Sequence, residues 1–242
     1  MKSKTSVLLT ASLLLACAGA AADPGYYVVT AYSDKGLRTA DFRYWATRAP
    51  GWPEVRWPEL GFGYGVTDRW YSEVFASWIA SSALKTHISS WNWQNDFLLT
   101  QGQYPIDVAL HSQLIRMAGG DQAIEFGPVL QTDIGRTQLN LNFFLDRTFR
   151  TAAPQPTALK YQWQVRHRWL PGLHVGLQGF GELGPWDEWS PRSQQSNRAG
   201  PALFGKLALG DGYTLNWQAA YLRGKTYGAS GTMLTGRVYL TY

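Results

Sequence analysis

The chain has 242 residues, a formal net charge of +5 and an aromatic content of 14% that includes 12 Trp and 13 Tyr. Its single cysteine, Cys17, lies near the N-terminus, so the remainder can form neither a disulfide nor a cysteine metal site. The charge is mild and dispersed, which gives no argument for nucleic acid as a partner. No apolar run of about 18 residues follows residue 22, and this excludes a helical membrane protein.

Residues 1–22 have the three parts of a secretory signal peptide. Two lysines supply the positive start, residues 7–15 form a short apolar core, and residues 18–20 or 20–22 offer a small-residue cleavage site. The core is too short to span a bilayer, so we expect the segment to be cleaved. The residues before Cys17 also resemble a lipoprotein cleavage site, which leaves lipidation of Cys17 as an alternative.

After a leader at residues 23–36, apolar and polar residues alternate in a series of short segments. A period of two indicates strands with one apolar and one polar face. The alternation is plainest in residues 159–169, where Lys, Gln and Arg residues alternate with aromatic or aliphatic residues and with His167. The predicted strands cover residues 38–46, 60–66, 70–80, 87–100, 106–114, 123–133, 138–143, 159–169, 173–183, 202–209, 213–222 and 232–242.

The last predicted strand ends the chain on an aromatic residue. Val238, Leu240 and Tyr242 fall on its apolar face, whereas Arg237 lies on the polar face. Such an ending resembles the closing strand and assembly signal of Gram-negative outer-membrane β-barrels. The resemblance implies an outer-membrane location in a Gram-negative bacterium, with the lipid bilayer, lipopolysaccharide and the barrel-assembly machinery as partners.

We therefore predict an all-β fold in which residues 37–242 form a closed antiparallel up-and-down transmembrane β-barrel of about 12 strands. Connections that alternate between short and long are typical of periplasmic turns and outer loops. Short turns are expected at Thr67, Gln101, Gly135, Leu170 and Gly210, whereas residues 119–121 are short where an outer loop is expected. The leader at residues 23–36 is interpreted as periplasmic or inserted into the lumen.

Two features of the sequence distinguish a membrane barrel from a soluble β-sandwich. A secreted β-sandwich would also alternate, but the polar faces are dense in Gln and Asn, and aromatic residues lie near strand ends, as in the girdles of membrane barrels. These aromatic residues are Trp70, Trp78, Trp91, Trp169 and Tyr242.

Pro128 falls inside a predicted strand, where a missing ladder donor suggests a bulge or a kink.

The polar faces, if they point inward, place acidic residues early in the chain and basic residues late. One interpretation is a transverse field across an open pore that sets selectivity. The other is a set of ion pairs across the lumen that plug the barrel. The acidic candidates are Asp41, Glu59, Glu73, Asp96, Asp107, Glu125 and Asp133, and the basic ones are Lys160, Arg166, Arg168, Lys206 and Arg237.

One pair of residues suggests catalysis. His87 and Ser89 are two apart on one strand face, and the pair resembles the His-x-Ser of outer-membrane phospholipases and lipid A deacylases. The resemblance is restricted to these two residues, because Ser90-Trp91 follows where the phospholipases have Asn-Gly. The other histidines are dispersed and show no metal-ligand spacing, so we expect neither a metal nor a cofactor.

The function expected from these features is an outer-membrane channel or transporter for small polar or amphipathic solutes. The chain is diffusely similar to the transporter-like barrels of aromatic-compound degradation and fatty-acid uptake. The longest predicted loop, residues 184–200, would act as an outer gate through Trp186, Asp187, Glu188, Trp189 and Arg192. The alternatives are a lipid-surface hydrolase that uses His87 and Ser89, and a non-conducting structural or adhesive barrel.

Overall fold

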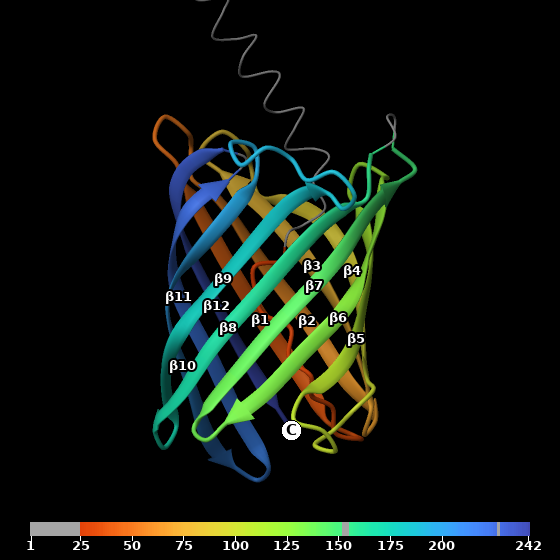
Figure 1. The fold of residues 1–242 in the computed structure, drawn as a ribbon, viewed down its shortest axis with the longest axis vertical. Coiled ribbons are helices and arrows are strands. Elements are labelled where there is room, and N and C mark those ends of the chain that lie inside the picture. The colour runs from red at the N-terminus through yellow and green to blue at the C-terminus, as the bar shows by residue number, and fades with distance from the viewer. Residues whose placement is uncertain (1–24, 152–154, 227) are drawn as a thin grey trace, which may run out of the picture.

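A computed structural model describes residues 25–151, 155–226 and 228–242. Twelve antiparallel strands follow one another around a closed barrel, in which the first strand pairs with the last (Figure 1). The strands are β1 (Arg38–Arg48), β2 (Val55–Thr67), β3 (Trp70–Ser81), β4 (His87–Leu98), β5 (Asp107–Met117), β6 (Gln122–Ile134), β7 (Thr137–Phe149), β8 (Ala158–Leu170), β9 (Leu173–Pro185), β10 (Ser196–Gly210), β11 (Tyr213–Thr226) and β12 (Ala229–Thr241).

The predicted closed antiparallel barrel is confirmed, and two of its connections differ from the sequence prediction. The connection at Gln101 is longer than a tight turn, since β4 ends at Leu98 and β5 begins only at Asp107. The connection between the predicted strands 213–222 and 232–242 is shorter than their bounds imply, because β11 continues to Thr226 and β12 begins at Ala229. The signal peptide and Cys17 lie outside the described residues. No helix among the residues that the structure describes is long and apolar enough to cross a membrane.

Three prolines lie inside strands without shifting the register. Pro58, Pro128 and Pro201 each remain paired with the preceding strand. In the pairing with the following strand, the proline and one neighbour have no partner. The pairing then resumes in the same register, as between Phe126 and Val129 of β6. Each proline therefore removes a ladder donor on one side only. The bulge offered as one explanation for Pro128 is wrong.

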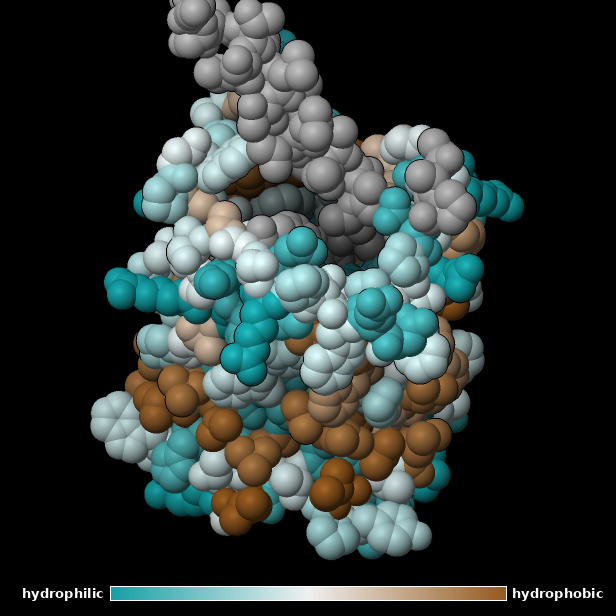
Figure 2. Space-filling view, turned by 45° about the horizontal axis from the view of Figure 1, so that its top comes forward, coloured by the Kyte–Doolittle hydropathy of each residue, from teal (hydrophilic) through white to brown (hydrophobic). Residues whose placement is uncertain are grey.

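The two surfaces of the wall differ in the way that a membrane barrel requires. Large apolar side chains such as Phe62, Trp91 and Leu114 point outward and are exposed, and Figure 2 shows an apolar belt below a hydrophilic rim. Inward positions carry buried polar residues such as Asn142 and Gln164. Because a bilayer solvates only apolar groups, this belt and the closed ladder place the barrel in the outer membrane.

The described part of the leader, residues 25–36, lies inside the barrel (Figure 1). It reaches the wall at β2, where the Gly36 amide donates to the Gly65 carbonyl over 2.8 Å and the Gly65 amide donates to the Leu37 carbonyl over 2.7 Å. A Cβ atom at Gly65 would overlap the carbonyl oxygen of Asp34. The glycine therefore allows the leader to pass against the strand.

We predict that Gly65→Ala weakens the attachment of the leader to β2, because backbone atoms cannot move aside as a flexible side chain can. Overpacking of this kind costs about 1–3 kcal/mol of the free energy of unfolding. Denaturant unfolding in lipid vesicles measures the loss. Gly236→Ala is the matched control, since the nearest atom to a Cβ there is 3.6 Å away. Equal stability of the two variants would contradict the tight contact.

Candidate functional site in the lumen

The leader is an extended segment whose two faces contact opposite walls of the lumen. Tyr26 and Val28 pack in a cluster with residues of β9 to β12 and with Trp45 of β1. Tyr27 and Val29 pack in a second cluster with residues of β4 to β7. All four leader side chains are at most 5% exposed. The leader thus divides the lumen along its length.

Side chains of the wall satisfy the polar backbone of the leader. The Val29 amide donates to Gln162 Oε1 over 3.1 Å, and the Val29 carbonyl accepts from Asn142 Nδ2 over 2.9 Å. Across the lumen, Thr235 Oγ1 donates to the Tyr26 carbonyl over 2.8 Å. Buried backbone groups need such partners. The inward Gln, Asn and Thr residues therefore hold the leader in place.

The first charge cluster joins β1, β2, β3 and β12. Arg43 Nε lies 2.7 Å from Asp41 Oδ2, and Arg43 Nη2 lies 2.6 Å from Glu73 Oε1. Arg237 Nη2 lies 2.7 Å from Asp41 Oδ2, and Glu59 Oε1 accepts from the Ser77 hydroxyl over 2.6 Å. The cluster therefore ties the closing pair of strands to the acidic side chains of β2 and β3.

Tyr27 connects this cluster to the leader. Its ring centroid is 3.8 Å from the guanidinium carbon of Arg43 and 5.3 Å from that of Arg237. The Tyr27 hydroxyl donates to Gln94 Oε1 over 2.7 Å. A desolvated cation above an aromatic face is a favourable contact of about 2 kcal/mol. The two arginines therefore hold this side of the leader.

The second charge cluster joins β4 to β8. His111 Nδ1 lies 2.6 Å from Asp96 Oδ1, and His111 Nε2 lies 3.6 Å from Glu125 Oε1. Lys160 Nζ lies 3.1 Å from Glu125 Oε2 and 2.6 Å from Asp146 Oδ2. Each contact joins nearby strands, so the charges are neutralised along the wall. The described part of the chain has no group of three or more His, Cys, Asp or Glu residues able to hold a metal ion.

The charges do not form the two opposed walls that the transverse-field interpretation requires. Arg43 lies among the early acidic residues, and Lys160 is bound by two acidic residues. Of the predicted lumen residues, Asp41, Glu59, Glu73, Asp96, Glu125 and Lys160 are buried, Asp107, Arg166 and Arg237 are half-buried, and Asp133, Arg168 and Lys206 are exposed.

The other sequence candidates lie outside this arrangement. Trp186 and Trp189 are 56% and 59% exposed, and Asp187, Glu188 and Arg192 are exposed with them on the outer loop. In the predicted assembly signal, Val238 and Tyr242 are exposed on the outer surface, and Leu240 is half-buried.

His87 and Ser89 do not form a catalytic pair in this structure. His87 Nδ1 lies 2.9 Å from the carbonyl of Lys85. Ser89 Oγ is buried and has no hydrogen-bond partner among the described residues. A serine nucleophile requires a base within hydrogen-bond reach. This geometry gives the hydrolase alternative no support.

Several residues of the site were missed in the sequence analysis. Arg43 and His111 alternate in phase with Asp41 and Asp107, the predicted lumen residues of their own strands, so strand parity could have found them. Asp146 lies beyond the predicted strand of residues 138–143, because β7 continues to Phe149. Glu182 lies near the end of the predicted strand 173–183, and Arg198 falls inside the predicted loop 184–200 but belongs to β10 in the structure. For the contacts of Tyr26 and Tyr27 the sequence holds no signal, because they join residues far apart in the chain.

Comparisons with known proteins agree on the fold. An outer-membrane channel from Pseudomonas putida F1 is 13% identical with a TM-score of 0.61, and the match covers 92% of this chain and 100% of that one. The NanC porin is 8% identical with a TM-score of 0.58, and the KdgM porin, solved in complex with disordered oligogalacturonate, is 6% identical with a TM-score of 0.56; each match covers 84% of this chain and 98% of the porin. No family model matches, and no curated protein matches significantly. The likeness shows the fold of a Gram-negative outer-membrane β-barrel.

We predict that Arg43→Gln lowers the free energy of unfolding by about 3–5 kcal/mol, because it leaves the buried carboxylate of Glu73 without its ion-pair partner. Urea unfolding of the refolded barrel in lipid vesicles measures the change. Arg168→Gln is the control, since the pair that Arg168 forms with Asp133 is about half exposed and contributes about 0–1 kcal/mol. Similar losses in the two variants would contradict the role of the first charge cluster.

Proposed function

We propose that the protein is an outer-membrane channel for small polar or amphipathic solutes, and that the leader controls the opening of its lumen. The observation that carries the proposal is the segment of residues 25–36 inside a polar barrel, with Tyr26 and Tyr27 buried against opposite walls. A lumen divided in this way passes solutes only where the leader leaves space or moves aside.

The way in which the leader is attached supports such movement. Among the described residues, the backbone-to-backbone hydrogen bonds from the leader to the wall lie at its end, at Gly36 and Leu37. Further inside, side-chain hydrogen bonds and ring contacts hold the leader, as at Val29 and Tyr27. These contacts can break without opening the barrel, because none of them belongs to the strand ladder.

The side chains of the lumen favour the proposed class of solute. The inward faces combine amides, such as Gln164 and Gln178, with charges of both signs. Rings of Phe180 and Phe204 add apolar surface. Amides and charges exchange hydrogen bonds with polar groups, and the rings accommodate an apolar part. The KdgM porin, whose fold is similar, was solved with an oligogalacturonate, a polar solute.

Single-channel recording in a planar bilayer tests the proposal. We expect small conductance steps for the native protein and clearly larger steps for a Tyr26→Ser/Tyr27→Ser variant, because the variant loses the two rings that anchor the leader. Tyr32→Ser is the matched control, since Tyr32 belongs to the same leader but is 55% exposed. We expect its steps to equal those of the native protein.

A native protein and a double variant that both insert and stay silent would contradict the channel proposal. Insertion is checked by the heat-dependent gel mobility of the folded barrel.

A Ser89→Ala variant in the same preparation tests the hydrolase alternative. Hydrolysis of phospholipid by the native protein that this substitution abolishes would favour the hydrolase over the channel.

A further inference from the structure

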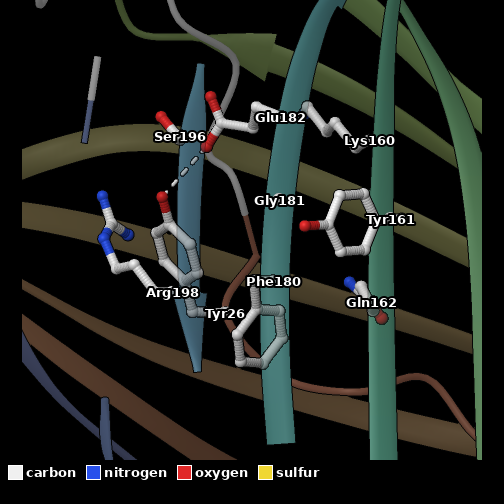
Figure 3. A pocket seen from close by; sticks show the side chains of 9 residues that line it. All are labelled: Tyr26, Lys160, Tyr161, Gln162, Phe180, Gly181, Glu182, Ser196 and Arg198. Carbon is white, nitrogen blue, oxygen red and sulfur yellow. Dashed lines mark hydrogen bonds between the residues drawn. The ribbon is translucent and has the colours of Figure 1, made fainter. Parts of the chain in front are cut away.

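The two halves of the lumen beside β8, β9 and β10 differ in how they are filled. In the outer half, inward-facing residues such as Phe180 and Arg198 are buried. The leader covers them there, because the Tyr26 ring packs edge to face on Phe180 and the Tyr26 hydroxyl donates to Glu182 over 3.0 Å (Figure 3). The other half lies toward the short turns at residues 171–172 and 211–212, which form the periplasmic end of the barrel.

The leader leaves this side of the lumen free at the periplasmic end. It joins the wall at β2 through Gly36, and β2 and β8 are six positions apart in the closed order of twelve strands. Beside β8, β9 and β10, Arg166 and His174 are half-buried, and Arg168 and Lys206 are exposed. We call the space that these four side chains line the periplasmic vestibule.

The charged side chains of the vestibule face the lumen rather than the lipid. Arg166 and Arg168 continue the face of the buried Gln164 on β8, and Lys206 continues the face of the buried Phe204 on β10. Side chains that point inward and are still exposed to solvent require solvent beside them. The lumen is therefore open to water at this place.

Cations outnumber carboxylates in the vestibule. Arg168 is paired with Asp133, with 2.8 Å between Nη2 and Oδ1. Within the part of the chain that the structure covers, neither Arg166 nor Lys206 has a carboxylate at ion-pair distance. Asp107, the inward acidic residue of β5 at the same end, accepts a hydrogen bond from a turn amide instead. Two positive charges thus remain without a counter-ion.

Arg166 presents the geometry that binds a carboxylate. Its Nε donates to His174 Nδ1 over 2.7 Å, and its guanidinium carbon is 5.3 Å from the centroid of the Phe204 ring. These contacts hold the guanidinium across β9, whereas its two terminal nitrogens bind no other group of the described chain. A guanidinium with both terminal nitrogens free binds a carboxylate through two parallel hydrogen bonds.

Lys206 adds a second positive charge on the periplasmic side of this group. It follows Phe204 by two residues on the same face of β10, about 7 Å further along the strand. Among the described residues its ammonium has no partner. An anion that moves between Arg166 and the periplasm passes this charge, which raises the local concentration of anions.

We propose that the periplasmic vestibule binds small organic carboxylates, with the carboxylate on the terminal nitrogens of Arg166 and with Lys206 attracting it. The proposal rests on the channel function for its biological use and names anionic solutes as the class that the channel prefers. Binding is measurable without conduction, so the two proposals can fail separately.

Ligand-observed NMR of the folded protein in deuterated detergent tests the site with propionate and its neutral isostere propionamide. We expect propionate to bind about tenfold more tightly, because only its carboxylate accepts two charge-assisted hydrogen bonds. In Arg166→Gln, the affinity for propionate should fall to that for propionamide. In Lys206→Gln it should fall by about twofold to threefold, because Lys206 acts through its field rather than by contact.

Arg116→Gln is the matched control, because it removes a cation that is exposed on the outward face of β5. Its affinity for propionate should be unchanged. Equal affinities of the native protein for the two probes would overturn the proposal, and so would a propionate affinity that survives Arg166→Gln. If Arg166→Gln does not fold, the native affinity ratio and Lys206→Gln decide the result.

The outcome separates this site from the channel function. Preferential binding of propionate by a protein that is silent in planar bilayers would support the site and contradict the channel. A protein that conducts but binds the two probes equally would support the channel and overturn the site.

Discussion

Closure of the hydrogen-bond ladder between β1 and β12 is the constraint on which the rest of the structure depends. In lipid, each backbone polar group needs an internal partner, and the register from Thr39–Thr241 to Arg48–Thr232 provides it at the seam. Closure fixes the parity of every strand and so directs one face of each into the lumen. Arg237 of β12 and Asp41 of β1 reinforce the seam from inside, at 2.7 Å.

The enclosed lumen is filled by local ion pairs and by the leader. The charge clusters join adjacent or nearby strands, so they neutralise the wall without crossing the centre of the barrel. The centre is occupied by Tyr26, Tyr27 and the residues after them, held by side chains such as Asn142 and Thr235. The described side chains thus combine a rigid wall with a segment that lies outside the strand ladder, which is the physical basis of the proposed control of passage.

Much of the fold could be predicted from the sequence, because a period of two is a local signal. Strand parity placed Asp41, Glu73 and Lys160 inside the barrel, and an aromatic end identified the closing strand. Which charged residues pair with each other was harder to predict from the sequence. Which residue neutralises Lys160 depends on the register between strands and on side-chain reach, and the opposed-wall interpretation failed for that reason. The buried side chains of the leader depend on contacts between distant parts of the chain, which no local pattern encodes.

The measurement that tests the central claim most directly is hydrogen–deuterium exchange of the barrel in lipid nanodiscs, followed in peptides that cover residues 26–33 and 186–195. A leader that occupies the closed lumen should exchange far more slowly than the outer loop, because its amides are buried and hydrogen-bonded, as at Val29. Exchange of residues 26–33 at the rate of the exposed loop would show that the lumen is not occupied by the leader at rest and would contradict this account.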